Sequence, residues 1–162
     1  MAEELIVAQG GKAEKYEVLY RQIEALMEGE SDMIANMANI SAVLKEAFGF
    51  WWVGFYIVKP CLGGGEELVL GPFQGPLACT RIKKGRGVCG TAWDKGETII
   101  VPDVDQFPGH IACSSLSRSE IVVPVWHGNE IVAVLDIDSE HLATFDEVDK
   151  LWLEKIVKLF DK

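Results

Sequence analysis

Two kinds of side chain in this sequence could carry redox chemistry: thiols and carboxyls. Three cysteines occur in two segments that contain glycine, LACTRIKKGRGVCG and FPGHIACSSLSRSE, and three acidic residues follow along the chain. A thiolate is a nucleophile and a carboxyl can supply a proton, so together they indicate redox chemistry that needs both a nucleophile and an acid. The six residues are Cys79, Cys89, Cys113, Glu120, Asp136 and Asp138.

The spacing of the acidic residues indicates a shared surface. Asp136 and Asp138 lie two residues apart in the run IVAVLDID, so both should point to one face of a strand. Val132 and Val134 share that face, which is therefore not plainly exposed, and paired acids on a half-buried face are often functional. Glu120 precedes the apolar run IVVPVW and could close the same pocket. The alternative is that the three acids are simply solvated.

Two roles are possible for the aromatic pair Trp52 and Tyr56, and two for His110. Trp52 and Tyr56 share parity on their predicted strand, where they could form either the wall of a ligand pocket or an aromatic stripe of the core. His110 lies three residues before Cys113 and could lower the pKa of that thiol. A histidine in a surface loop is the alternative.

Two other kinds of site are disfavoured by spacing. The three cysteines with His110 could make a Cys3His zinc set, but they lack the short paired spacing of structural zinc sites. Gly85 to Gly90 fits G-x-G-x-x-G, yet Gly96 should end any helix within two turns, whereas a dinucleotide fingerprint opens a long helix. We therefore predict a glycine turn with positive φ there, and no metal or cofactor. Cys61, beside a Gly-rich turn, is expected to be a packing residue.

Composition limits the class of protein. The chain has 162 residues, 49% of them hydrophobic, which predicts one domain over residues 13–162 after a flexible N-terminus at 1–12. A net charge of −10 argues against a general nucleic-acid-binding role and against an anionic membrane surface. The longest apolar run, about 48–58, is shorter than the ~20 residues of a membrane span. Without a basic signal-peptide start, we expect a cytoplasmic location with reduced thiols.

Periodicity predicts the elements that position these residues. Two helices are expected first, from about Tyr16 to Leu26 and from a Ser31 cap to Phe48, and a closing helix should follow a capping box of Thr144 and Glu147. The apolar stripe of the closing helix is expected to include Leu151. Other expected elements are strands at about 51–58, 67–70, 78–82, 98–101, 120–126 and 130–137, a short helix at 88–93 and a long loop at 102–119.

This order of elements predicts an α+β domain. Its centre should be one antiparallel six-stranded sheet, with helices packed on one face and a loop-covered pocket on the other. Residues 127–129, His-Gly-Asn, are a hairpin signal that joins the last two strands.

Several strings in the chain closely resemble the free methionine-(R)-sulfoxide reductases, which are small enzymes built on a GAF domain. The strings are WVGFY, LGPFQGPLAC, GVCGTAW, VPDVDQFPGHIAC, SEIVVP and VLDIDSE. The resemblance runs from about Trp52 to Trp152, most of the chain. Two departures are Ser114, where family members usually carry Asp, and Cys61, which is an additional cysteine.

The resemblance implies thiol-dependent reduction of free L-methionine-(R)-sulfoxide to L-methionine. Cys113 would be the nucleophile and would become a sulfenic acid. Cys79 would be the principal resolving cysteine and would form an intramolecular disulfide with it, recycled by thioredoxin. Cys89 would sit in the pocket as an assisting or alternative resolver. A loop at 102–119 that moves would let the two cysteines meet.

For the pocket, the resemblance implies that the three acids surround the sulfoxide and the amino group and that Trp52 and Tyr56 form the aromatic wall. Crowded carboxyls repel one another, so at least one of them should stay protonated near neutral pH and serve as a proton donor. GAF domains commonly dimerise through their helices, so a homodimer is also expected. The alternative function is a non-catalytic GAF module that senses a small ligand, which would need the pocket but not the thiols.

Overall fold

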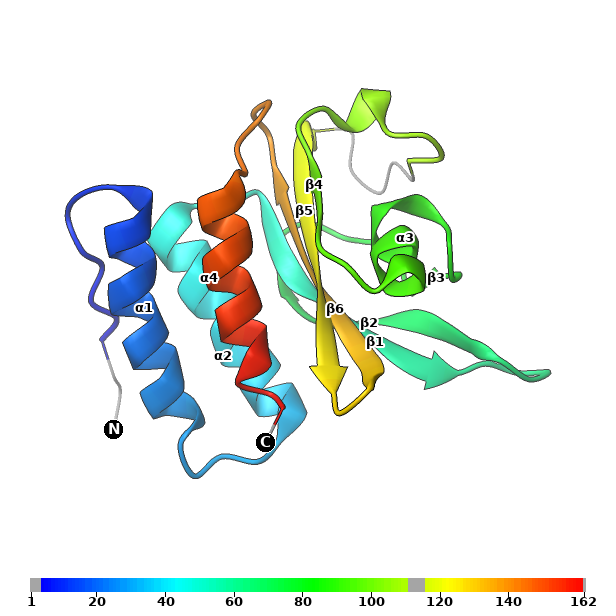
Figure 1. Ribbon diagram of the computed structural model, residues 1–162, viewed down its shortest axis with the longest axis horizontal. Helices are drawn as coiled ribbons and strands as arrows, with labels where there is room; N and C mark the ends of the chain where they lie inside the picture. Colours follow the sequence, from blue (N-terminus) through cyan, green and yellow to red (C-terminus); the bar gives the residue numbers. More distant parts are fainter. Residues whose placement is uncertain (1–3, 111–115, 162) are drawn as a thin grey trace.

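A six-stranded antiparallel sheet forms the centre of the computed structural model, which describes residues 4–110 and 116–161 (Figure 1). The strand order is β3-β2-β1-β6-β5-β4, and each pair of neighbouring strands is antiparallel, as predicted. The strands are β1 (Trp52–Pro60), β2 (Glu66–Gln74), β3 (Arg81–Ile82), β4 (Ile99–Val101), β5 (Ser119–His127) and β6 (Glu130–Ser139). The helices are α1 (Lys12–Met27), α2 (Met33–Phe48), α3 (Gly87–Lys95) and α4 (Glu147–Lys158), with a short 3-10 turn at Val104–Gln106.

Alternate residues of the central strands face two different layers. Helices α1, α2 and α4 cover one face of the sheet (Figure 1), where Phe55 of β1 and Leu135 of β6 are fully buried. Residues of the other parity, such as Tyr56 and Val134, pack in a second cluster that includes Val88 of α3. The prediction of helices on one face is therefore right for three helices and wrong for α3, whose apolar side closes the pocket face.

The N-terminus of α2 differs by one residue from the prediction. Asp32, not Ser31, is the cap, and its side chain accepts a hydrogen bond from the Ala35 backbone N–H at 2.8 Å. Both residue types are good caps, so local preference alone could not choose between them. The predicted end is confirmed, because Gly49 follows the helix in the left-handed conformation with φ of 67°.

The capping box of α4 is also displaced. Asp146 accepts hydrogen bonds from the first turn, and the side chain of Asp149 accepts one from the Asp146 backbone N–H at 2.9 Å. The predicted box of Thr144 and Glu147 is wrong, because Glu147 is itself the first residue of the helix. An aspartate pair performs the same reciprocal capping in a later register.

Two smaller details differ as well. β3 is limited to Arg81–Ile82, shorter than predicted; before it, the Thr80 carbonyl still accepts a hydrogen bond from Leu70 of β2, and the Cys79 carbonyl accepts one from the Tyr56 side chain. On α4, Leu151 is 53% exposed whereas Leu153 is fully buried, so the prediction that Leu151 lies on the buried stripe is wrong.

A buried ion pair fastens α1 to α4. The side chain of Asp149, only 1% exposed, accepts hydrogen bonds from Lys12 Nζ at 2.7 Å and from the Tyr16 hydroxyl at 2.6 Å. A buried carboxylate is tolerated only when it is paired and hydrogen-bonded in this way. Before α1, the backbone of Ile6 exchanges hydrogen bonds with the Gln22 side chain at 2.8 and 2.7 Å. Across the described residues, no helix is both long and apolar enough to cross a membrane.

Candidate active site

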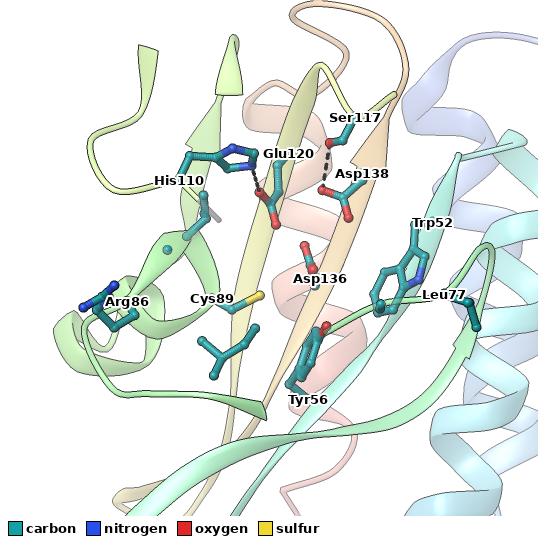
Figure 2. Close-up of a pocket in the computed structure, with 14 residues that line it drawn as sticks. Trp52, Tyr56, Leu77, Arg86, Cys89, His110, Ser117, Glu120, Asp136 and Asp138 are labelled. Carbon is teal, nitrogen blue, oxygen red and sulfur yellow. Dashed lines mark hydrogen bonds and ion pairs between the residues drawn. The ribbon is translucent and has the colours of Figure 1, made fainter. Parts of the chain in front are cut away.

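A cavity lies on the α3 side of the sheet and is lined by residues of β1, α3, β5 and β6. Figure 2 shows carboxyls that reach it from β5 and β6, with Cys89 on one side and the aromatic rings of Trp52 and Tyr56 on the other. The predicted site residues that line it are Trp52, Tyr56, Cys89, Glu120, Asp136 and Asp138. The structure thus brings together all of the predicted acids, both aromatic residues and one of the three thiols.

Strand register explains why the acids meet. Glu120 on β5 is paired directly with Asp138 on β6, and Asp138 is paired with Trp52 on β1. Asp136 lies two residues from Asp138, so its side chain points to the same face. The predicted face of Asp136 and Asp138 is confirmed, and the antiparallel β5–β6 hairpin adds Glu120 to it.

Burial dominates the electrostatics of the three acids. Glu120 and Asp136 are 5% and 6% exposed, and burial raises the pKa of both carboxyls above the ordinary range. The negative charges of Asp136 and Asp138 raise the pKa of Glu120 further. The pKa of Asp138 is raised by burial and then by Asp136, although a hydrogen bond from Ser117 opposes the shift. The group therefore retains protons at pH values where isolated carboxyls are ionised.

One carboxyl oxygen is left without a partner. The buried Oδ1 atom of Asp136 has no hydrogen-bond partner among the described residues. An orphaned buried acceptor is costly and is rare in native structures, so it requires an explanation. Because Asp136 lines the cavity, a ligand with an N–H or O–H donor would satisfy this oxygen.

Cys89 occupies the first turn of α3 and is 4% exposed. Burial raises the pKa of its thiol well above the ordinary value, and the negative charges of Asp136, Glu120 and Asp138 raise it further. A protonated, buried thiol is a poor nucleophile, so Cys89 is not poised to attack by itself.

Three of the site residues also lie close enough to share one metal ion. Potential ligand atoms of Cys89, Glu120 and Asp136 lie within 4.8 Å of one another. The Cys3His alternative loses a ligand, because Cys79 is disulfide-bonded and offers no thiolate.

Of the three remaining cysteines, the structure describes Cys61 and Cys79. Cys79, on the segment between β2 and β3, is disulfide-bonded. Cys61 is a free thiol in the β1–β2 turn, where its backbone N–H bonds to the Gly65 carbonyl at 3.0 Å, and it does not line the cavity. Cys113, the predicted nucleophile, lies outside the described residues. Its role and its pairing with Cys79 stay predictions.

The glycine motif behaves as a turn. Gly85 has φ of +80°, and α3 ends after nine residues at Gly96, which is left-handed with φ of +68°. At Gly90, an added Cβ would lie 2.5 Å from the Lys83 carbonyl oxygen, so close backbone approach also requires glycine. The prediction of a turn rather than a dinucleotide fingerprint is confirmed.

Three lining residues add to the predicted set. The Ser117 hydroxyl donates a hydrogen bond to Asp138 Oδ1 at 3.2 Å, and Arg86 lies at the start of α3. His110 Nε2 lies 3.9 Å from Glu120 Oε1, with only 17% of its side chain exposed (Figure 2). His110 is therefore beside an acid in the pocket rather than on an open surface loop. For Ser117, the sequence indication was its position in a serine-rich segment, three residues before the predicted site residue Glu120.

Comparisons with known proteins agree with this geometry. Residues 31–160 match the model of the GAF domain family. The chain is 59% identical to GAF domain-containing protein A of Dictyostelium discoideum, covering 99% of both chains, and 45% identical to the free methionine-R-sulfoxide reductase of Escherichia coli, covering 93% of this chain and 89% of that one.

A solved structure is similar over nearly the whole fold. The free methionine-R-sulfoxide reductase from Neisseria meningitidis, in complex with its substrate, superimposes with a TM-score of 0.93 at 56% identity, covering 98% of this chain and 93% of that one. The resemblance seen in the sequence strings is confirmed. The chain belongs to the free methionine-R-sulfoxide reductases, a family of GAF-domain enzymes.

Proposed function

We propose that this protein reduces free L-methionine-(R)-sulfoxide to L-methionine with its own cysteines. The observation that carries the proposal is a buried cluster of three carboxyls with raised pKa values, open to a small cavity and adjacent to a cysteine segment. Relatives that bear the name of this activity support it.

Binding would use both ends of a free amino acid. The ammonium group would donate to the orphaned Asp136 Oδ1 and to any ionised neighbour, which explains an otherwise unsatisfied oxygen. Trp52 and Tyr56 stack with ring centroids 5.9 Å apart and offer apolar faces to the methyl and methylene groups. The acids and the aromatic rings line the same cavity, so one free amino acid could contact both.

The chemical step needs a thiolate and a proton. The thiolate of Cys113 would attack the sulfoxide sulfur while a protonated carboxyl, Glu120 or Asp138, gives its proton to the oxygen. In the resulting adduct the hydroxyl group moves to the Cys113 sulfur while the bonds of the methionine sulfur to oxygen and to Cys113 break, so methionine leaves and Cys113 becomes a sulfenic acid. Burial and mutual repulsion of the carboxyls keep such a proton available near neutral pH.

Resolution would follow by thiol chemistry. The Cys79 thiol would attack the sulfenic sulfur of Cys113, releasing water and leaving a disulfide. The disulfide state of Cys79 supports this pairing, because Cys61 and Cys89 carry free thiols. Thioredoxin would then reduce the disulfide by exchange, as the family resemblance implies, which requires a reducing compartment such as the cytoplasm. Cys89, with its raised pKa, would assist in the pocket. A homodimer formed through the helices stays a prediction.

Turnover of three substrates tests the proposal. With a small dithiol as reductant, the protein should form methionine from the free R epimer and much less from the S epimer or from methionine sulfoxide within a peptide. Binding of the free R epimer without any methionine formed would favour the alternative, a ligand-sensing GAF module. Equal turnover of the peptide would contradict the proposed substrate class.

A further inference from the structure

The aromatic wall of the pocket is hydrogen-bonded to the cysteine segment. Trp52 Nε1 donates to the Pro76 carbonyl at 3.0 Å, and the Tyr56 hydroxyl donates to the Cys79 carbonyl at 2.9 Å. Both donors come from one face of β1, four residues apart, and their acceptors are three residues apart on the segment between β2 and β3. The Trp52 Nε1 and the Tyr56 hydroxyl thus both bond to the segment that carries Cys79, and the two rings line the cavity.

Backbone packing holds the same segment tightly against the wall. Gly75 has φ of +142°, and a Cβ added there would lie 2.7 Å from Trp52 Cδ1 and 2.9 Å from the Trp51 carbonyl oxygen. The Trp52 ring also stacks on Phe73 with centroids 5.2 Å apart. The chain therefore crosses directly over Trp52 before it reaches Cys79.

Few other contacts hold this segment once the disulfide of Cys79 is reduced. Residues 75–80 form no strand, the side chain of Leu77 is 89% exposed, and the Thr80 carbonyl accepts a hydrogen bond from the Leu70 backbone N–H at 2.9 Å. In the reduced protein the two side-chain hydrogen bonds would therefore act with the Thr80 contact to position the Cys79 backbone. The Tyr56 hydroxyl stays a neutral donor, because burial and the nearby acids raise its pKa.

We infer that Tyr56, with Trp52, is a positioning residue for Cys79: it holds the resolving thiol beside the pocket so that the sulfenic acid is captured quickly. The inference rests on the proposed function. The step it affects is attack by the Cys79 sulfur on the sulfenic sulfur of Cys113, in which the S–S bond forms, the S–O bond breaks and the oxygen leaves as water with the thiol proton. The hydrogen bond from Tyr56 would speed this step by keeping the Cys79 sulfur close to the pocket.

Tyr56→Phe tests this directly, because it keeps the ring of the wall and removes only the hydroxyl. The reduced protein is mixed with free methionine-(R)-sulfoxide without a recycling reductant, and methionine, trapped sulfenic acid and remaining thiols are measured over time. Because the Tyr56 ring also lines the binding pocket, the variant's own rate of methionine formation is the internal reference. Relative to that rate, disulfide formation should slow by roughly threefold to tenfold, as expected for loss of one hydrogen bond, and trapped sulfenic acid should rise.

Tyr16→Phe is the matched control. It removes another buried tyrosine hydroxyl with a hydrogen bond, to Asp149 at 2.6 Å, from the opposite side of the sheet. This variant should lose stability and leave both rates unchanged. Gly75→Ala, which displaces the segment while the Tyr56 hydroxyl remains, should slow disulfide formation in the same way as Tyr56→Phe.

The outcomes separate the inference from the proposed function. An equal loss of both rates in Tyr56→Phe would make Tyr56 a wall residue only and overturn the inference. Disulfide formation at the unmodified rate in Tyr56→Phe would overturn it as well. If the unmodified protein forms no methionine at all, the proposed function itself fails.

Discussion

Glu120 and Asp138 lie directly opposite each other on β5 and β6, and both carboxyls face the same cavity. Like charges at opposed positions of a sheet destabilise it, and burial makes their ionisation costlier still. Asp136 adds a third carboxyl two residues away on β6. A fold that needed only stability would gain from apolar residues here, so the cluster agrees with the proposed roles in proton donation and substrate binding.

Replacing one of these acids should stabilise the protein at neutral and alkaline pH. Asp138→Asn keeps an acceptor oxygen for the Ser117 hydroxyl and gains a donor toward Glu120. The free energy of unfolding should rise by about 1–2 kcal/mol at pH 8, which corresponds to a few degrees in Tm for a chain of this size.

The pH dependence of this gain has a definite sign. The pKa of Asp138 is raised in the folded state, so the folded protein binds more protons than the unfolded chain. The stability associated with this carboxyl is present below its unfolded pKa of ~3.9 and is lost as pH rises through the folded pKa. The advantage of Asp138→Asn should therefore shrink toward pH 4 in thermal melts. Exposed Glu130→Gln, on the same strand, is the control and should change nothing; a lower Tm for Asp138→Asn at every pH would contradict the account.

The sequence predicted the acid cluster because strand parity and hairpin order are local rules. Alternate spacing placed Asp136 and Asp138 on one face, and a short connection made β5 and β6 antiparallel neighbours, which brought Glu120 to the same face. The six-stranded sheet followed from similar patterns. Cys113, the predicted nucleophile, lies outside the described residues, and its role stays a prediction from the family resemblance.

Other features could not be predicted because they depend on the path of the chain in space. The hydroxyls of Tyr56 and Ser117 bond to groups 23 and 21 residues away, and no periodicity encodes such contacts. The short helix α3 was predicted as a helix, yet its assignment to the pocket face depends on which side of the sheet the loops cross. At α2, Ser31 and Asp32 are both good caps, and only the folded chain selects one.

The rate of the chemical step should depend on pH through the carboxyl cluster. The step needs a thiolate and a protonated carboxyl, so methionine formation should have a bell-shaped pH profile whose alkaline limb reports the carboxyl. The negative charge of Asp136 helps to raise the pKa of Glu120 and of Asp138. In Asp136→Asn the alkaline limb of kcat should therefore move to lower pH. A limb that stays in place in this variant would show that the acid lies elsewhere.

The ion pair between α1 and α4 should matter for stability and not for chemistry. Lys12→Met leaves the buried Asp149 carboxylate without its cation, although the Tyr16 hydroxyl remains. We expect the free energy of unfolding to fall by roughly 1–3 kcal/mol, because a buried charge then lacks its partner. Urea titration measures the loss, and Lys59→Met, an exposed lysine, is the control. A parallel loss of kcat below the unfolding transition would mean that the helices transmit effects to the pocket.

The cysteines should separate into distinct kinetic classes. Cys113→Ser should abolish methionine formation even with a small dithiol, by about a thousandfold or more, because burial keeps the Cys89 thiol protonated and Cys61 does not line the cavity. Cys79→Ser should still form methionine in a single turnover, since the chemical step precedes resolution, but should lose most thioredoxin-dependent turnover. Cys61→Ser, a free thiol outside the cavity, is the matched control and should behave like the unmodified protein.

Each class has an outcome that would reverse its assignment. Dithiol-dependent activity that survives in Cys113→Ser would show that another cysteine attacks the sulfoxide sulfur. A single-turnover rate in Cys79→Ser that falls as far as its steady-state rate would place Cys79 in the chemical step. Cys89→Ser should reduce turnover only modestly, because a thiol held protonated among three acids can donate a hydrogen bond but cannot readily attack. Serine keeps a hydroxyl donor at this position, so a severe defect in this variant would require sulfur chemistry at Cys89 itself.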